Sequence, residues 1–261
     1  MKSLALSACV LVCLGIVGPL QAHRLFKPPL EFELDGHPCF ILPSDNPARG
    51  RPWVWYAPTL KRHPDPSHTW YIEQLLEKGI GVAGCDLGEV RGSPRSIREF
   101  TRFYEEMVKR GLSDKPVLLG QSRGGLMMLT WAMNHPGKVR AVAGIYPVCN
   151  LESWPLKRNQ GATLADFGMS ERALRSKLKS FNPVDNLDGL ARNAVPVFMV
   201  HGDSDKVVPL SENSAIVKKR YTALGGKVKL KVIPGKGHAV VDEFFKCPEL
   251  IEFLISQSLE P

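Results

Sequence analysis

The chain has 261 residues, of which 44% are hydrophobic and 23% charged, a balance typical of a globular protein rather than a disordered or fibrous one. This length is most simply one domain with a full-sized core. The net charge of +8 could attract acidic polymers, but the sequence has no arginine-rich arm and no basic run with interleaved aromatic residues. We therefore expect no nucleic-acid partner.

The first 22 residues have the layout of a secretory signal peptide. Lys2 gives a positive start, the run 4–20 is apolar, and Ala22 supplies a small residue before a cleavage point. A transmembrane anchor and lipoprotein processing at Cys9 are the alternatives, but the run is short for a bilayer and only eight residues precede Cys9. We expect a secreted or periplasmic protein, with a mature chain 23–261 that carries a charge of +7 and no membrane span.

Export would leave four cysteines in the mature chain, namely Cys39, Cys85, Cys149 and Cys247. In an oxidising compartment four cysteines can form two disulfides in any of three connectivities. The sequence leaves the choice between disulfides and buried thiols open. No CxxC motif and no paired Cys/His cluster is present, so we expect no metal site.

Short strand-like runs alternate with helix-like segments along the mature chain, which predicts a mostly parallel sheet flanked by helices. The expected strands are 31–34 and 40–43 in an opening hairpin, then 53–57, 80–85, 116–120, 139–145, 195–201 and 228–233. The expected helices are 70–78, 94–110, 124–134, 211–224 and 240–256. In the helix 94–110 the apolar residues recur at spacings that line one face.

Residues 147–194 interrupt this alternation as a charged insertion between the strands near 139–145 and 195–201. It contains Trp154-Pro155 and a helical stretch at 170–179. An insertion over the C-terminal edge of a parallel sheet is where a lid or substrate-binding cap is placed. A structural crossover helix with long loops is the alternative, and one segment can serve as both. Trp154 is our candidate substrate-binding residue here.

The segment Gly120-Gln121-Ser122-Arg123-Gly124 matches the G-x-S-x-G nucleophile elbow. In that motif the serine occupies a tight, strained turn between a strand and a helix, so the residues two positions away must lack side chains. Here the strand-like Val117–Leu119 precedes it and an apolar helix follows. Ser122 is therefore the expected nucleophile.

An acid and a histidine follow Ser122 on loops after later strands. The block 201–209 offers Asp203 and Asp205, and we choose Asp205 because Asp203 lies nearer the strand end, where it can bond the turn backbone. His238 follows the glycines of 234–238. The chain order Ser, Asp, His is that of α/β-hydrolases.

The whole mature chain resembles the α/β-hydrolase superfamily, and the blocks 120–125 and 201–209 are similar to its esterase and prolyl-oligopeptidase-like branches. Together with the Trp53-Val54-Trp55 strand, the Arg91–Pro94 turn and Ser153-Trp154-Pro155, they resemble a group of exported bacterial hydrolases suspected of acting on decorated polysaccharides. The resemblance implies the α/β-hydrolase fold and a Ser122, Asp205, His238 triad.

The oxyanion hole departs from the family's pattern. One donor should be the backbone N–H of Arg123, directly after the nucleophile. The family's usual His-Gly after the third strand is replaced by Tyr56-Ala57-Pro58, and Pro58 has no N–H, which leaves Ala57 or Tyr56 as the second donor. The guanidinium of Arg123 is expected to pair with a nearby carboxylate, with an acidic substrate group as the alternative.

These residues predict a secreted serine hydrolase that cleaves carboxylic esters through an acyl-enzyme and needs no metal or organic cofactor. The expected substrate is a small-molecule or polysaccharide ester, in particular an acylated carbohydrate. A peptidase of the prolyl oligopeptidase type is the alternative, although 239 residues leave no room for that family's gating propeller. A non-catalytic binding protein on this scaffold is a third interpretation, against which the intact triad argues.

Overall fold

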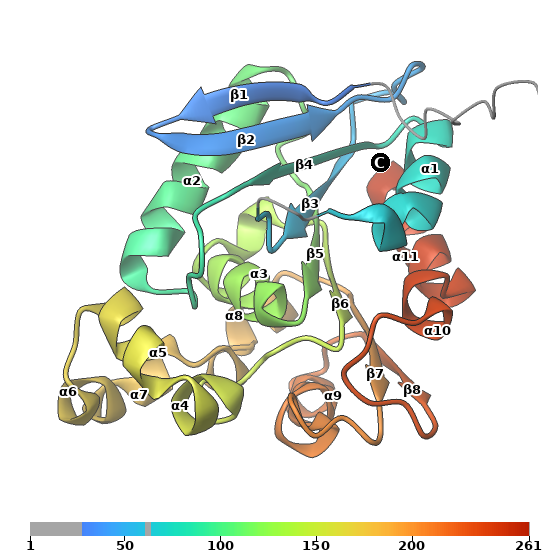
Figure 1. Cartoon of the computed structure of the whole chain (residues 1–261). Coiled ribbons are helices and arrows are strands. Elements are labelled where there is room, and N and C mark those ends of the chain that lie inside the picture. Colours follow the sequence, from blue (N-terminus) through green and yellow to red (C-terminus); the bar gives the residue numbers. More distant parts are fainter. Residues whose placement is uncertain (1–27, 61–63, 261) are drawn as a thin grey trace, which may run out of the picture.

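An eight-stranded sheet forms the centre of the computed structural model, which describes residues 28–60 and 64–260 (Figure 1). The strands follow the order β1-β2-β4-β3-β5-β6-β7-β8. The first two strands pair antiparallel and the other six run parallel. Their bounds are β1 Leu30–Leu34, β2 His37–Leu42, β3 Trp53–Ala57, β4 Gly81–Cys85, β5 Val117–Gln121, β6 Ala141–Ile145, β7 Val197–Gly202 and β8 Val228–Ile233. The predicted signal peptide, 1–22, lies outside the described residues.

The opening hairpin is tighter than expected. Strand β2 begins at His37 and not at residue 40, so only Asp35 and Gly36 join it to β1. Both turn residues have positive φ, 51° and 83°. A two-residue turn of this kind suits the right-handed twist of the strands, and Asp-Gly is a preferred sequence for it.

The central strands are buried on both faces, which explains their continuous apolar sequences. In β3 all five residues are buried, and alternate side chains join two separate core clusters. Trp55 packs on one face against Phe100 and Trp131, with ring centroids 5.7 and 4.8 Å away. Tyr56 joins the cluster on the opposite face.

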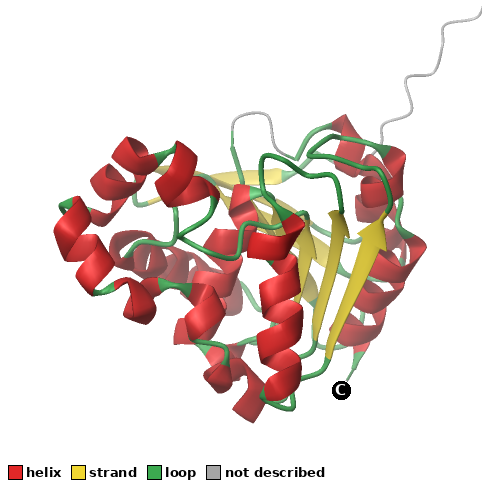
Figure 2. Ribbon diagram, turned by 90° about the horizontal axis from the view of Figure 1, so that it is seen from below, coloured by secondary structure: helices red, strands yellow, loops and turns green. Residues whose placement is uncertain are grey.

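Helices cover both faces of the sheet (Figure 2). One face carries α1 Thr69–Glu77, α10 Asp242–Phe245 and α11 Pro248–Leu259, and the other carries α2 Pro94–Lys109, α3 Arg123–Asn134, α8 Asp188–Arg192 and α9 Ser214–Ala223. Short 3₁₀ turns occupy Pro66–His68, Pro136–Lys138, Pro183–Asp185 and Leu210–Glu212. The three-layer arrangement confirms the predicted α/β-hydrolase fold. Within the described residues no helix combines the length and apolar character needed to cross a membrane.

The insertion between β6 and β7 is helical and packs in two ways. Its helices are α4 Trp154–Arg158, α5 Gln160–Phe167, α6 Glu171–Ser176 and α7 Leu178–Phe181, followed by α8. The first four build a separate apolar cluster with Leu126 of α3 and Val208, whereas Leu190 of α8 joins the main core. The segment is therefore both a cover near the start of α3 and a crossover.

Three predicted helices are broken in the structure. The stretch 170–179 divides at Lys177 into α6 and α7. The helix 211–224 is a 3₁₀ turn and α9, separated at Asn213, whose φ of −126° and ψ of −99° are not helical. The final helix 240–256 divides into α10 and α11, because Pro248 has no N–H to continue a helix and instead begins one.

Candidate active site

A sharp turn between β5 and α3 holds Ser122. Its φ of 49° and ψ of −121° lie outside the regions that most residues adopt. Its N–H donates to the carbonyl oxygen of Ile145 at 3.0 Å, and its own carbonyl accepts from Gly125 and Val148 at 3.0 and 2.8 Å. These bonds hold the strained turn between two parallel strands, as a nucleophile elbow requires.

The glycines around Ser122 are required by space. A Cβ atom added to Gly120 would lie 2.6 Å from the Cα atom of Gly125, and one added to Gly124 would collide with the carbonyl oxygen of Ala57. The helix can therefore approach β3 and β5 only with glycine at these positions. This close approach places the N-terminus of α3 directly beneath Ser122.

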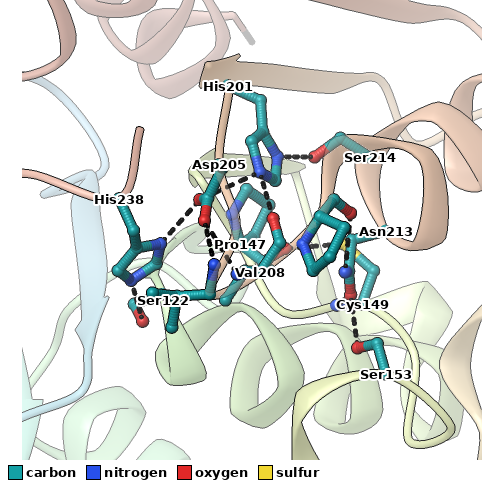
Figure 3. A network of polar contacts seen from close by, with 12 residues as sticks. Ser122, Pro147, Cys149, Ser153, His201, Asp205, Val208, Asn213, Ser214 and His238 are labelled. Atoms are coloured by element: carbon teal, nitrogen blue, oxygen red, sulfur yellow. Dashed lines mark hydrogen bonds and ion pairs between the residues drawn. The ribbon is translucent and has the colours of Figure 1, made fainter. Parts of the chain in front are cut away.

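Three side chains that the sequence places far apart come together above the elbow (Figure 3). The hydroxyl oxygen of Ser122 lies 2.9 Å from Nε2 of His238, and Nδ1 of His238 lies 2.7 Å from Oδ2 of Asp205. The carboxylate can only accept, so Nδ1 carries the hydrogen and Nε2 is the acceptor for the Ser122 hydroxyl. The three side chains form a continuous hydrogen-bonded line, an arrangement with the chemistry needed to activate a serine.

The loop after β7 fixes Asp205 as a buried carboxylate. Its Oδ1 atom accepts from the N–H groups of Val207 and Val208 at 2.9 and 2.8 Å. Burial alone would raise the pKa of Asp205, but hydrogen bonds from His201, His238 and the Val208 N–H outweigh it and hold the pKa well below its usual range. Asp205 is therefore ionised at neutral pH and can stabilise a protonated His238.

The second aspartate of this loop, Asp203, does not contact His238 but bonds Gly235 and Ser204. Asp203 is exposed, and its Oδ1 atom accepts from the N–H of Gly235 at 2.8 Å and from the Ser204 hydroxyl at 3.0 Å. It therefore joins the turn after β7 to the loop that carries His238. Of the two candidates in the sequence, the structure places Asp205 against the histidine.

A second histidine, which the sequence reasoning missed, touches the same carboxylate. His201 is fully buried at the end of β7, with Nε2 2.8 Å from the carbonyl oxygen of Val208 and 3.4 Å from Oδ2 of Asp205 (Figure 3). The Val208 carbonyl can only accept, so Nε2 carries a hydrogen. Nδ1, 2.7 Å from the Ser214 hydroxyl, is then an acceptor in the neutral ring. His201 thus fixes the loop that presents Asp205.

Tyr146, which the sequence reasoning also missed, packs its ring against the ring of His238. The two ring centroids lie 4.4 Å apart, and Tyr146 accepts a hydrogen bond of 3.0 Å from the side-chain amide of Gln121. The Gln121 oxygen in turn accepts from the Tyr56 hydroxyl at 2.8 Å. Burial raises the pKa of Tyr146 to about 12, so its hydroxyl stays neutral at physiological pH. The residue before the nucleophile is therefore connected to the histidine.

A buried asparagine links the Asp205 loop to the insertion. The side-chain oxygen of Asn213 accepts from the N–H of Cys149 at 2.9 Å and from the Ser153 hydroxyl at 3.0 Å, both near the start of the insertion. Its side-chain nitrogen donates to the carbonyl of Pro209. Asn213 is fully buried, so these bonds are protected from competition with water.

The two predicted oxyanion donors occupy the appropriate elements. Arg123 is the first residue of α3, where the N–H has no partner within the helix. Ala57 ends β3 beside Gly120 of β5, and its carbonyl faces Gly124. Their role as donors to a reacting oxygen remains a prediction.

The Arg123 side chain forms an ion pair with Glu89, which is the structural pairing expected from the sequence. Trp154 begins α4 and is half-buried, and the guanidinium carbon of Arg91 lies 5.8 Å from the centroid of its ring. The Arg91 backbone N–H donates to Asp166 of α5 at 2.6 Å. Trp154 thus lies where the insertion contacts the loop 86–93, and a contact with substrate remains a prediction.

No three His, Cys, Asp or Glu side chains gather as a metal site would require among residues 28–60 and 64–260. A serine, a neutral imidazole and an ionised carboxylate in this order supply nucleophilic and general acid–base chemistry.

The fold and the elbow together define a member of the α/β-hydrolase superfamily. The chain belongs to the prolyl oligopeptidase family, whose family model matches residues 91–254. The family match indicates a serine hydrolase. A comparison with curated protein sequences finds no match.

Solved structures with the same fold include both small and large chains. Est1E from Butyrivibrio proteoclasticus is 19% identical with a TM-score of 0.66, and the match covers 89% of this chain and 99% of Est1E. A puromycin-hydrolyzing peptidase from Mycobacterium tuberculosis is 18% identical with a TM-score of 0.65, covering 87% of this chain and 38% of the peptidase. A putative dipeptidyl aminopeptidase IV from Bacteroides ovatus is 15% identical with a TM-score of 0.68, covering 88% and 35%. The chain thus spans well under half the length of these two peptidases.

Proposed function

We propose that this protein is an esterase that hydrolyses carboxylic esters through an acyl-enzyme on Ser122. The observation that carries the proposal is the line from Ser122 through His238 to Asp205, with separations of 2.9 and 2.7 Å. The strained elbow turn supports it, because backbone strain at a half-buried serine is expected where that residue reacts.

The reaction follows from the protonation states of the three groups. His238 takes the hydroxyl proton through Nε2 as the Ser122 oxygen attacks the ester carbonyl. Asp205 remains ionised and stabilises the imidazolium. The imidazolium then gives its proton to the leaving alcohol, which releases the alcohol and leaves an ester on Ser122. Water, deprotonated by His238, then attacks this ester. The bond to the Ser122 oxygen breaks, the carboxylic acid leaves, and the imidazolium returns its proton to Ser122.

The tetrahedral intermediates carry a negative oxygen that backbone donors must stabilise. The N–H of Arg123 at the start of α3 is one proposed donor, helped by the helix dipole, and Ala57 at the end of β3 is the other. Pro58 removes the donor that would directly follow β3.

A peptidase is the second candidate, and a specific observation favours it. The family match is to prolyl oligopeptidases, and two of the solved structures with this fold are described as peptidases. The same three side chains would cleave an amide if His238 protonated the leaving amine. The two candidates share the nucleophile and differ in leaving group, so kinetics with paired substrates separate them.

We also propose that the protein is exported and acts on an acylated carbohydrate. The layout of residues 1–22 supports export, and the motif resemblance to exported bacterial hydrolases supports a polysaccharide-derived ester. Trp154, half-buried at the edge of the insertion, is the proposed aromatic contact for a sugar ring.

A matched pair of chromogenic substrates tests the esterase proposal. The kcat/KM is measured with p-nitrophenyl esters of increasing acyl length and with aminoacyl p-nitroanilides, using wild type and Ser122→Ala. We expect turnover of the short esters that is lost in the variant. Turnover of the anilides alone would establish the peptidase instead. Release of acetate from acetylated polysaccharide, compared with deacetylated polysaccharide, tests the carbohydrate proposal separately.

A further inference from the structure

Two of the four cysteines lie directly opposite each other on neighbouring strands. Cys39 of β2 pairs with Cys85 of β4 in the antiparallel register. The adjacent pair is the hydrogen-bonded one, because the N–H of Asp86 donates to the carbonyl of Pro38 at 2.8 Å. Cys39 and Cys85 therefore form a non-hydrogen-bonded pair, the position in an antiparallel ladder where facing side chains approach most closely.

The two sulfur atoms already face each other. Their separation is 2.8 Å, and both side chains are buried in the same core cluster. The Cα atoms of a non-hydrogen-bonded antiparallel pair are about 4.5 Å apart, which lies within the range that a disulfide spans. Both residues are free thiols in this structure. The backbone spacing of such a pair therefore suits a disulfide bond.

We propose that Cys39 and Cys85 are a disulfide site, which joins the opening hairpin covalently to the parallel sheet. The bond forms by exchange with a small disulfide or with an oxidised dithiol protein. One cysteine thiolate attacks a sulfur of the oxidant to give a mixed disulfide and one thiol. The second cysteine then displaces the remaining half. Two thiols become one S–S bond, and the oxidant is reduced to two thiols that take up the two protons.

The other two cysteines are expected to stay reduced. Cys149 belongs to the core cluster on one face of the sheet, and Cys247 belongs to the cluster on the opposite face. The sheet therefore separates them. Burial raises the pKa of each thiol, which makes both unreactive in the folded protein. Of the pairings that four cysteines allow, the structure favours this single bridge.

The bridge is expected to form while the chain folds. In the folded protein the hydrogen bond to Cys39 and then burial raise the pKa of the Cys85 thiol far above its usual range, so a thiolate is rare. During folding both thiols are still accessible to an oxidant. The site is therefore tested by refolding, which gives a result whatever compartment the protein occupies.

The test is peptide mapping after oxidative refolding of the full chain. Reduced, denatured protein is refolded in a buffer of reduced and oxidised glutathione, denatured again, and blocked with N-ethylmaleimide before digestion with trypsin. We expect the peptides 25–49 and 79–91 to appear joined, at two hydrogens less than their summed mass. Cys149→Ser is the matched control and should keep the joined species, whereas Cys39→Ser should lose it.

Recovery of both peptides with maleimide on Cys39 and Cys85 from correctly refolded protein would overturn the proposal, as would joining of either to the peptide of Cys149. Thermal unfolding gives a second measurement if a single variant folds poorly. The bridge spans 46 residues of sequence. We expect reductant to lower the Tm of the oxidised protein by roughly 4–8 °C. The same shift in a Cys39→Ala/Cys85→Ala double variant would contradict the assignment.

Discussion

Replacing Asp205 with asparagine should move the ring hydrogen of His238 from Nδ1 to Nε2. The oxygen Oδ1 of Asp205 accepts from two backbone N–H groups, those of Val207 and Val208, at 2.9 and 2.8 Å. An amide nitrogen there would face two donors, so the asparagine must keep its oxygen on that side. Its NH₂ group then takes the place of Oδ2, 2.7 Å from Nδ1 of His238. Nδ1 must accept, and the ring hydrogen moves to Nε2, which faces Ser122.

In that tautomer His238 cannot take the serine proton. Serine proteases with the same substitution lose a factor of about 10⁴ in kcat, equivalent to about 5 kcal/mol of transition-state stabilisation. We expect a loss of this size here, with KM unchanged, because the substitution does not alter the surface that binds the ester. The assay is steady-state hydrolysis of p-nitrophenyl acetate at pH 7, with circular dichroism to establish that the variant is folded.

Asp203→Asn is the matched control. Its side chain faces Gly235 and Ser204 and not the histidine, so kcat should stay within a factor of about three of wild type. The reasoning is refuted if Asp205→Asn keeps more than about a tenth of the wild-type kcat, or if both variants lose activity equally.

Three further outcomes follow from the same contacts. Gly124→Ala should destabilise the protein by about 1–3 kcal/mol in urea unfolding, because its Cβ meets the Ala57 carbonyl, whereas Gly161→Ala, which has open space around it, should not. Asn213→Ala removes the acceptor for three buried donors and should cost about 2–4 kcal/mol, whereas an unchanged urea midpoint would show that water replaces it. The folded-state pKa of Asp205 is lowered, so its contribution to stability is present above pH of about 4 and is lost as pH falls further. The Tm of wild type should therefore fall more steeply below that pH than the Tm of Asp205→Asn, and parallel curves would contradict this assignment.

The layer architecture could be predicted because the strands are short, apolar and separated by helical periodicity. The strands β3 and β8 have the predicted bounds, and most other elements differ by one or two residues. The errors occur where a single residue overrides the periodicity. Pro248 begins a new helix within the predicted last one. Asn213 has a non-helical backbone, and its side chain accepts a hydrogen bond from Ser153 of the insertion. Hydrophobic spacing carries no information about such interruptions.

The candidate triad could be named from the sequence because motif, chain order and element all restrict it. The residues that position the triad could not be named from the sequence. His201, Tyr146 and Gln121 lie next to predicted features, but their roles depend on which strands are neighbours and which face each residue occupies. A histidine at the end of a buried strand was the available signal for His201. The facing cysteines likewise required the strand register, because Cys39 and Cys85 are distant in sequence.

Covalent labelling is the most direct test of the claim that Ser122 is the reactive nucleophile. Wild type and Ser122→Ala are treated with a fluorophosphonate probe, digested with trypsin and analysed by mass spectrometry. We predict a single adduct in the peptide 111–123, on Ser122, that is absent from the variant and from protein denatured before labelling. An adduct that persists in Ser122→Ala, or folded wild type that remains unlabelled, would contradict the account.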